Sequence, residues 1–275
     1  MTVSPRIRSA LTIAGSDSGG GAGIQADLKT FAAHDVHGLS AIAALTAQNT
    51  RTVAAVHVPP VEFLAAQIDA CFEDFAIGAV KLGMLGTAGV VEAVADAFDH
   101  RLAAPGAPPV VLDPVMVATS GGRLMESGGA IDALIRRLLP RAAILTPNLP
   151  EAERLCGRAV RSRADMRDAA RALLDLGAAA VLLKGGHLED GGDAVDLYVS
   201  AHESHEIAHP RLDLRAHGTG CTLASAIAAN LCLGRTPLQA CIDAADYVHR
   251  ALLSGYRPGR SDLVVLDHFG AAPAA

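Results

Sequence analysis

The sequence predicts an α/β fold in which a central, mostly parallel β-sheet is covered by helices on both faces. Apolar runs of strand length alternate along the chain with segments whose apolar residues recur at helical spacing. Runs such as Val110–Leu112 are apolar throughout, which is typical of strands that are buried on both faces. Because ligands of such sheets bind beyond the carboxyl ends of the strands, we expect a site where these runs end.

The elements follow one another in a regular order. The expected strands are Ala10–Ala14, Leu39–Ala47, Val53–Val58, Ala79–Leu82, Val110–Leu112, Ala143–Leu145 and Ala180–Leu183. The expected helices are one that starts at Ile24, then Val61–Phe72, Val90–Phe98, Ile131–Leu139, Met166–Leu176, Thr219–Leu231 and Leu238–Leu253. The turn-like segment Asn49–Thr52 joins two strands into a hairpin, and Gly177 stands where a C-cap glycine belongs.

The composition fits a single α/β enzyme domain. The chain has 275 residues, of which 51% are hydrophobic and 19% charged. No internal repeat is visible, and Pro105–Pro109 reads as a loop rather than a linker, so we expect one domain over residues 1–275. The net charge of −6 gives no reason to expect a nucleic-acid partner.

The chain ends and the cysteines indicate a cytoplasmic protein. Met1–Thr12 contains Arg6 and Arg8 but no long apolar run, so no signal peptide is visible. No stretch approaches the roughly 20 uninterrupted apolar residues of a spanning helix, and we expect no membrane partner. The five cysteines form no CxxC pair, and an odd number suits a reducing compartment.

A glycine-rich segment, Gly15–Gly23, joins the first strand to the first helix. Glycines allow the backbone to approach a ligand closely, and a flexible turn is the alternative interpretation. The segment is not a P-loop, and Ile24 stands where GxGxxG requires its last glycine. Asp27 follows in the first turn of the helix. It is either an acceptor for a substrate hydroxyl or a carboxylate that favours the positive helix end.

Gln48 follows the apolar strand that ends at Ala47. Its carboxamide offers an acceptor and two donors side by side, which match the ring nitrogen and exocyclic amine of an aminopyrimidine. A hairpin turn residue is the alternative interpretation.

The segment Gly218-Thr219-Gly220-Cys221 precedes a long helix of small residues. Backbone N–H groups at a helix start bind anions, and phosphoryl transfer needs such donors where charge gathers. We expect the positive field there to lower the pKa of the Cys221 thiol, so that a thiolate accepts a hydroxyl proton. The alternative is a small buried side chain at a helix start.

Asn148 and Glu151 lie between a strand end and a helix start. Their oxygens suit Mg²⁺, usually through water, and they equally suit a capping box. His202, His205 and His209 fit no standard zinc spacing, so we expect them in a solvated loop or edge strand.

Lysine is rare among the 23 basic residues, where it occurs as Lys29, Lys81 and Lys184 alone. An ammonium and a guanidinium are not interchangeable. A lysine retained in such an arginine-rich chain therefore indicates a specific role, with chance as the alternative.

Taken together, these segments resemble the hydroxymethylpyrimidine and phosphomethylpyrimidine kinases of thiamine biosynthesis, which belong to the ribokinase-like superfamily. The matches occur in the family's order and end near residue 231. They are AGSD at residues 14–17 with GAGIQADLKT at 21–30, AQNT at 47–50, KLGML at 81–85, LDPVM at 112–116, TPNLPEA at 146–152, KGGH at 184–187 and HGTGCT at 217–222.

The resemblance implies a ribokinase-like fold with a small β-hairpin flap over the substrate site, and ATP with Mg²⁺ as the phosphoryl donor. It implies a pyrimidine pocket lined by Gly15, Asp27, Gln48, Met84 and Val115. The expected ATP and phosphate contacts are Asp113, Asn148 and Lys184, and the expected Mg²⁺ contacts, through water, are Glu151 and Asn148. The expected catalytic residues are Cys221, Gly218, Thr219 and Gly220.

The expected reaction is transfer of the ATP γ-phosphoryl group to the hydroxymethyl oxygen of 4-amino-5-hydroxymethyl-2-methylpyrimidine, and then to the resulting monophosphate to give the diphosphate. We also expect a homodimer. A pyridoxal kinase on the same fold is the nearest alternative, because some pyridoxal kinases resemble this chain in having Cys at the position of Cys221. A pyrimidine-binding sensor without catalysis is the other alternative.

Two segments depart from the family pattern. Leu214-Arg215-Ala216, on the nucleotide side, look unlike the family's Thr-rich approach to the catalytic segment. Glu189–Arg211 matches weakly, so no role is carried over to it.

Overall fold

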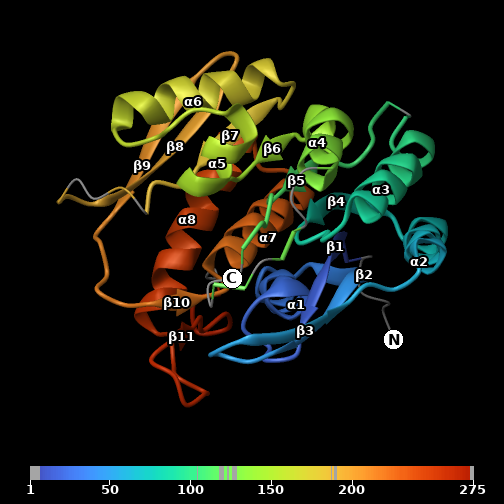
Figure 1. The fold of residues 1–275 in the computed structure, drawn as a ribbon, viewed down its shortest axis with the longest axis horizontal. Helices are drawn as coiled ribbons and strands as arrows, with labels where there is room; N and C mark the ends of the chain where they lie inside the picture. The colour runs from blue at the N-terminus through green and yellow to red at the C-terminus, as the bar shows by residue number, and fades with distance from the viewer. Residues whose placement is uncertain are drawn as a thin grey trace, which may run out of the picture.

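The computed structural model describes residues 7–103, 105–117, 121–122, 124–125, 129–186, 188 and 191–272. A nine-stranded sheet runs through it in the order β3-β2-β1-β4-β5-β6-β7-β8-β9 (Figure 1). The strands are β1 (Ser9–Asp17), β2 (His37–Gln48), β3 (Val53–His57), β4 (Ile77–Leu82), β5 (Val110–Leu112), β6 (Ile144–Leu145), β7 (Ala180–Leu183), β8 (Ala194–Ser200) and β9 (Ser204–His209). A separate parallel pair consists of β10 (Ala216–His217) and β11 (Val264–Val265).

The sheet is mostly parallel, as predicted. Strands β2, β1, β4, β5, β6 and β7 are parallel to their neighbours within this set. Strand β3 pairs antiparallel with β2 at one edge, and β8 and β9 add antiparallel strands at the other. The β2–β3 pair is the predicted hairpin, and Gln48 lies at its tip, opposite Val53.

Helices cover both faces of the sheet, as the apolar strands require. They are α1 (Gly23–Ala33), α2 (Val61–Asp74), α3 (Ala88–Arg101), α4 (Gly129–Ala133), α5 (Leu149–Cys156), α6 (Arg163–Asp175), α7 (Thr219–Cys232) and α8 (Pro237–Leu253). One apolar core joins the sheet to α2–α6, and a second joins it to α1, α7 and α8.

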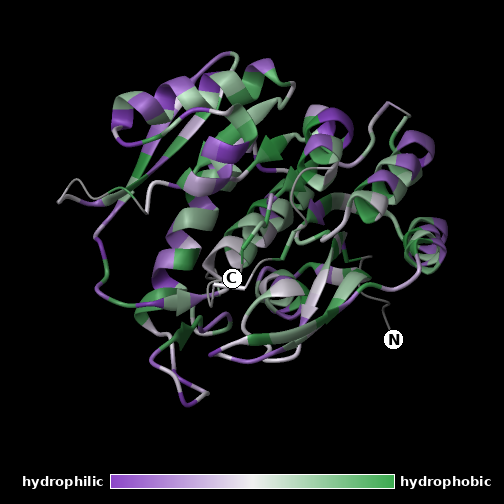
Figure 2. Cartoon of the chain, in the orientation of Figure 1, coloured by the Kyte–Doolittle hydropathy of each residue, from purple (hydrophilic) through white to green (hydrophobic). Residues whose placement is uncertain are grey.

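Successive strand residues contribute to opposite cores. In β5, Val110 and Leu112 belong to the core with α2–α6, whereas Val111 belongs to the core with α1, α7 and α8. All three are at most 2% exposed. Figure 2 shows the strands at the centre of the sheet as hydrophobic, while α2 and α6 carry hydrophilic stretches as well. A strand with both faces covered needs apolar residues at every position, which is why its run in the sequence is uninterrupted.

The segment predicted as one helix over Ile131–Leu139 is less regular in the structure. Helix α4 ends at Ala133, a π-helical turn spans Leu134–Leu138, and a 3₁₀ turn spans Leu139–Arg141. Pro140 explains the tightening at the end, because it has no N–H to donate and its ring clashes with the preceding turn.

The strands β8 and β9 were not predicted as an antiparallel pair. Strand β9 is an edge strand that contains His205 and His209, and only Ile207 of its six residues is buried. It therefore agrees with the solvated edge strand that was one of the two expectations for the histidines. Within the described residues, no group of three or more His, Cys, Asp and Glu side chains is placed to hold a metal ion.

Three helices begin at a Ser or Thr residue whose side chain caps the helix start. The side chains of Thr87, Ser162 and Thr236 accept backbone N–H groups at the starts of α3, α6 and α8. In contrast, α1 and α7 begin without a side-chain cap. The first N–H groups of both helices therefore have no partner from their own N-cap side chain.

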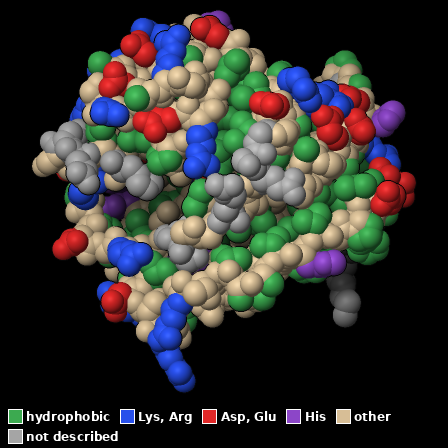
Figure 3. All heavy atoms as spheres, in the orientation of Figure 1, with side chains coloured by type: hydrophobic (Ala, Val, Ile, Leu, Met, Phe, Trp, Pro, Cys, Tyr) green, Lys and Arg blue, Asp and Glu red, His purple; other side chains and the backbone are tan. Residues whose placement is uncertain are grey.

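The surface shows no segregation of charge on the face in Figure 3, where acidic and basic side chains are interspersed with apolar ones. In the part of the chain that the structure describes, no helix has both the length and the apolar character needed to cross a membrane.

Candidate active site

A cavity of about 740 Å³ opens where the parallel strands end. It collects residues from the carboxyl ends of β1, β2, β4, β5, β6 and β7 and from the start of α7. The predicted site residues that line it are Gly15, Gln48, Met84, Asp113, Val115, Asn148, Glu151, Lys184, Gly218, Thr219, Gly220 and Cys221. The topology therefore brings together residues that are spread over 200 positions of sequence, as the rule for parallel sheets predicts.

Asp27 does not line this cavity, in contrast to the expectation that it contacts substrate. It lies on the fifth residue of α1 rather than in the first turn, and it is fully buried. Its two carboxylate oxygens accept Lys81 Nζ at 2.9 and 2.8 Å, Ser225 Oγ at 2.6 Å and Thr12 Oγ1 at 2.6 Å. With its acceptor positions engaged, Asp27 has a structural role beneath the cavity floor.

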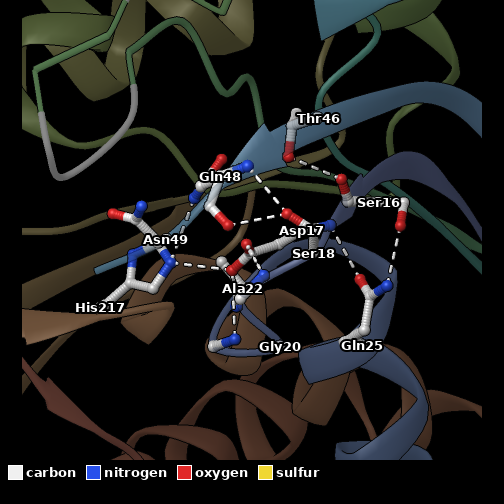
Figure 4. A network of polar contacts seen from close by, with 12 residues as sticks. Ser16, Asp17, Ser18, Gly20, Ala22, Gln25, Thr46, Gln48, Asn49 and His217 are labelled. Carbon is white, nitrogen blue, oxygen red and sulfur yellow. Dashed lines mark hydrogen bonds and ion pairs between the residues drawn. The ribbon is translucent and has the colours of Figure 1, made fainter. Parts of the chain in front are cut away.

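Asp17 organises the glycine-rich loop (Figure 4). Its carboxylate accepts the backbone N–H groups of Gly19 at 2.8 Å, Gly21 at 3.1 Å and Ala22 at 2.9 Å. His217 Nε2 lies 2.9 Å from the same side chain. Burial acts to raise the pKa of Asp17, but these hydrogen bonds outweigh it and hold the pKa below the usual value. Asp17 is therefore an ionised anchor for the loop.

The hairpin is clamped to the same loop. Ser18 Oγ donates to the carbonyl of Gln48 at 2.7 Å and accepts its N–H at 2.8 Å. Thr46 Oγ1 donates to the carbonyl of Ser16 at 2.9 Å. Gln48 is only 9% exposed, and its side-chain amide nitrogen lies 3.2 Å from His217 Nε2. Gln48 is thus more than a hairpin turn residue, because its side chain is held inside the cavity wall.

Gly218 to Cys221 form the start of α7 at the cavity. Gly218 has a φ of 85°, in the left-handed region, and a Cβ there would collide with the carbonyl oxygen of Gly21. Gly220 lies against Lys184, because a Cβ built on it would be 3.1 Å from Lys184 Nζ. The uncapped first turn lines a cavity that also holds the Lys184 ammonium group, an arrangement of a kind that suits an anion.

The thiol of Cys221 differs from the prediction. Burial raises its pKa to about 11, although the charge of Lys81 and the N–H of Gly23 act to lower it. Desolvation of the thiolate therefore outweighs the positive field of the helix start. Cys221 is partly exposed to the cavity but stays a thiol at neutral pH.

Asn148 and Glu151 form the capping box that was one of their two interpretations. Asn148 Oδ1 accepts the N–H of Glu151, and Glu151 Oε2 accepts the N–H of Asn148, both at 2.9 Å. Burial raises the pKa of Glu151, and Lys184, whose Nζ lies 3.9 Å away, acts against it. Both residues nevertheless line the cavity, so the cap and a ligand role are compatible in position.

All three lysines have specific partners at the site. Lys29 Nζ donates to the carbonyl of Gly20 at 2.8 Å and thereby braces the glycine-rich loop. Lys81 pairs with Asp27, and Lys184 Nζ lies 3.0 Å from Asp113 Oδ1. Burial acts to lower the pKa of Lys184, whereas the negative charges of Asp113 and Glu151 act to raise it. The charges outweigh burial, so the pKa of Lys184 is raised. The rarity of lysine was therefore an informative signal in this chain.

The described residues offer no preformed cage for Mg²⁺. The oxygens of Asn148 and Glu151 that form the capping box are already engaged with backbone N–H groups. The carboxylates of Asp113 and Glu151 face the cavity beside Lys184, and hard oxygen ligands of this kind suit Mg²⁺ through water. The donor set therefore fits an ion that arrives with phosphate and keeps its water.

One side of the cavity was not predicted from the sequence. Ala194, Asp196, His209, Pro210 and Arg211 line it, and all lie in the segment that matched the family weakly. The Arg211 guanidinium donates to the carbonyls of Gly186 at 2.7 Å and Leu188 at 2.8 Å, which ties the loop after β7 to the segment after β9. Antiparallel pairing of β8 with β7 and β9 creates this wall.

Comparison with known proteins gives consistent results. The family model described as phosphomethylpyrimidine kinase matches residues 17–265. The chain is 48% identical over 253 residues to the hydroxymethylpyrimidine/phosphomethylpyrimidine kinase of Rhizobium meliloti. The aligned region covers 90% of this chain and 91% of the relative. It is 47% identical over 256 residues to the bifunctional thiamine biosynthesis protein ThiED of Geobacter sulfurreducens, covering 92% of this chain but only 50% of that protein. The chain thus spans half the length of this bifunctional relative.

Solved structures share the fold. The pyridoxal kinase of Staphylococcus aureus in complex with AMP-PCP and pyridoxal superposes with a TM-score of 0.86 at 33% identity, over 97% of this chain and 95% of that one. The phosphomethylpyrimidine kinase of Clostridium difficile gives a TM-score of 0.78 at 40% identity, over 89% and 99%. The ribokinase-like fold is confirmed, and the chain belongs to the phosphomethylpyrimidine kinase family.

Proposed function

We propose that this protein transfers the γ-phosphoryl group of ATP to the hydroxymethyl oxygen of 4-amino-5-hydroxymethyl-2-methylpyrimidine, and then phosphorylates the monophosphate to the diphosphate. The observation that carries this proposal is that one cavity holds both the Gln48 carboxamide and the uncapped helix start at Gly218–Cys221. A heteroaromatic alcohol held at the first group would present its oxygen to an anion held at the second.

The residues divide into two groups along the cavity. Gln48 supplies hydrogen bonds to the ring edge, and Met84 and Val115 supply apolar contact next to Gly15. Asp113, Asn148 and Lys184 are the proposed ATP and phosphate contacts, where the ammonium of Lys184 beside Asp113 offsets phosphate charge. Little covalent chemistry falls to the protein in such a transfer, because positioning and charge neutralisation do most of it.

Mg²⁺ bound to ATP neutralises charge on the phosphates, and Glu151 and Asn148 would hold it through water. The N–H groups of Thr219, Gly220 and Cys221 receive the transferred group where negative charge gathers. The Cys221 sulfur takes the hydroxyl proton as the substrate oxygen attacks, and it does so from its minority thiolate form, which Lys81 favours.

Phosphorylation of pyridoxal is the second candidate function. It is favoured by the close superposition with the pyridoxal kinase of Staphylococcus aureus. The higher identity to named pyrimidine kinases, 48% against 33%, favours the pyrimidine. Steady-state kinetics with ATP-Mg²⁺ and each alcohol, followed by separation of mono- and diphosphate products, tests the proposal. A larger kcat/KM for pyridoxal would overturn it, and binding of the pyrimidine without turnover would favour a sensor.

We further propose one kinase domain over residues 1–275, because a single sheet connects both cores.

We propose a homodimer, since the β2–β3 hairpin exposes Leu45 and Val56, each 43% exposed, beside the edge of the sheet at β3. Sedimentation velocity tests this point.

A cytoplasmic location is supported by the five cysteines, all of which are free thiols. The proposed partners are small molecules rather than nucleic acid or membranes.

A further inference from the structure

His217 contacts both the glycine-rich segment, through Asp17, and the hairpin tip, through Gln48. Its Nε2 atom lies 2.9 Å from Asp17 Oδ2 and 3.2 Å from the amide nitrogen of Gln48 (Figure 4). The three residues are the last residues of β10, β1 and β2. Their exposed fractions are 5%, 3% and 9%, so water competes little for these contacts.

The two contacts of Nε2 require different protonation of that atom. A contact with the Asp17 carboxylate needs a hydrogen on Nε2, whereas a contact with an amide NH2 group needs a lone pair on Nε2. A neutral imidazole nitrogen carries either one hydrogen or one lone pair. Asp17 is an ionised carboxylate that also accepts three backbone N–H groups, so it can only accept from His217. Nε2 therefore carries the hydrogen and donates it to Asp17, and it cannot at the same time accept a hydrogen from an amide NH2.

The other ring nitrogen leads to the same assignment. His217 Nδ1 is buried and has no hydrogen-bond partner among the described residues. A buried N–H without an acceptor is unfavourable, so the ring hydrogen belongs on Nε2, where Asp17 accepts it, rather than on Nδ1. The contact with Asp17 and the lack of a partner at Nδ1 thus favour the same tautomer.

The tautomer determines how the carboxamide of Gln48 is turned. The oxygen and nitrogen of an amide exchange places by a half-turn about the last bond of the side chain. With a donor at Nε2, the amide oxygen is the atom that belongs beside His217, and the NH2 group belongs on the cavity side. The same residue would present an acceptor to the cavity if His217 carried its hydrogen on Nδ1.

We propose that His217, fixed by Asp17, is a positioning residue that turns the NH2 group of Gln48 into the cavity, so that the protein recognises its substrate by a ring-nitrogen acceptor. This inference rests on the proposed function for the identity of the substrate. It specifies which hydrogen bonds Gln48 forms with the substrate. The ring nitrogen accepts from the Gln48 NH2 group, and the second lone pair of the Gln48 oxygen accepts from the neighbouring exocyclic amine. In this proposal His217 acts through Gln48.

The first test needs no substrate, which separates it from the proposed function. Long-range ¹H–¹⁵N correlation spectra of the histidine-labelled free protein should show His217 with a hydrogen on Nε2 and none on Nδ1. The resonance is identified by its loss in His217→Ala, or through its backbone correlations if that variant does not fold. A hydrogen on Nδ1 with a bare Nε2 would overturn the proposal.

The second test measures how the amide is turned. Gln48→Glu keeps the size and the acceptor oxygen but replaces the NH2 donor by a second acceptor oxygen. The Kd for the hydroxymethylpyrimidine, measured by calorimetry, should therefore rise at least tenfold, while the Kd for ATP changes less than twofold. His217→Ala should weaken pyrimidine binding in the same selective way. His34→Ala removes another buried imidazole, which bonds to the carbonyl of Thr30 away from the cavity, and should leave both Kd values unchanged.

Unchanged or tighter pyrimidine binding by Gln48→Glu would overturn the proposal, as would equal losses for both ligands in His217→Ala. If the wild type binds the pyrimidine but does not phosphorylate it, the proposed function fails and the binding comparison still decides this inference. If the wild type binds no pyrimidine, the tautomer measurement decides it.

Discussion

Lys81 and Asp27 form an ion pair from which water is excluded: Lys81 Nζ lies 2.9 and 2.8 Å from the two carboxylate oxygens, and both side chains are fully buried. Thr12 and Ser225 donate to the same carboxylate at 2.6 Å. Ser225 is one helical turn beyond Cys221 on α7, and Lys81 lines the cavity, so the pair supports the floor on which the reaction is proposed to occur. Such a pair is tolerated in a core only because its hydrogen-bonding groups are satisfied.

Removing one partner of this pair should be strongly destabilising. Lys81→Met leaves an uncompensated buried carboxylate and should lower the free energy of unfolding by about 3–5 kcal/mol in urea titrations. The double variant Asp27→Asn/Lys81→Met should lose less than the sum of the two single variants, because the buried charge is gone. Arg101→Met is the matched control, since Arg101 pairs with Asp69 on the surface, and its loss should be much smaller. Additive losses would contradict the coupling of the two residues.

The core of the fold was predictable because the central strands are buried on both faces. Val110–Leu112 and Ala180–Leu183 were predicted with the bounds that the structure has. The pair of β8 and β9 was not, because an edge strand such as Ser204–His209 buries one residue and carries no apolar pattern. The cavity wall that these strands form was therefore not predicted either, since Asp196 and His209 belong to them.

The site was predictable where the chemistry follows from position along a strand or helix. Gln48, Asn148 and Gly218, which line the cavity, were singled out because they end strands or begin helices. Asp27 was expected to line the pocket and does not, because its carboxylate pairs with Lys81, 54 positions further on, which the sequence does not show. The pKa of Cys221 was wrong in direction because a helix start can be read from sequence, whereas the depth of burial around it cannot. Asp17 and His217 were quoted in the family motifs without a role, since their partnership spans 200 positions.

Loss of the Gln48 carboxamide should affect one substrate alone. Gln48→Ala should weaken binding of the hydroxymethylpyrimidine by roughly 1–3 kcal/mol, the cost of leaving polar groups of the ring unpaired. The affinity for ATP should barely change, because the proposed ATP contacts, Asp113, Asn148 and Lys184, follow strands other than β2. Calorimetric titration with each ligand measures both. An equal loss for the two ligands would show that Gln48 supports the structure rather than the substrate.

Glu151 tests whether a capping residue also serves the metal. Glu151→Gln keeps an acceptor for the N–H of Asn148, so the melting temperature should stay close to the wild-type value. Turnover should fall, and the Mg²⁺ concentration for half-maximal activity should rise, because a neutral amide holds hydrated Mg²⁺ less well. The measurement is a Mg²⁺ titration of activity at saturating substrates. A lower melting temperature with unchanged kinetics would assign Glu151 to the cap alone.

Cys221 gives a prediction about pH that is independent of turnover. Since burial raises its pKa to about 11, roughly one molecule in ten thousand carries the thiolate at pH 7. The fraction grows tenfold with each pH unit until pH approaches the pKa. The rate of Cys221 alkylation by iodoacetamide, followed by peptide mass spectrometry, should therefore rise about tenfold per unit from pH 6 to pH 9 without a plateau. A plateau near neutral pH would show that the helix start controls the thiol after all.

Turnover tests whether this thiol is the base. Cys221→Ala should lower kcat by a factor on the order of 10²–10⁴, while the Kd values of pyrimidine and ATP stay near those of the wild type, because the N–H groups of the helix start remain. Cys221→Asp should keep part of the activity, since a carboxylate accepts a proton at the same place, at the cost of repulsion from phosphate. Bound pyrimidine and nucleotide together should slow alkylation of the wild type by covering the sulfur. If Cys221→Ala turns over at the wild-type rate, the proton leaves the hydroxyl without a side-chain base, and the helix start alone accounts for catalysis at this segment.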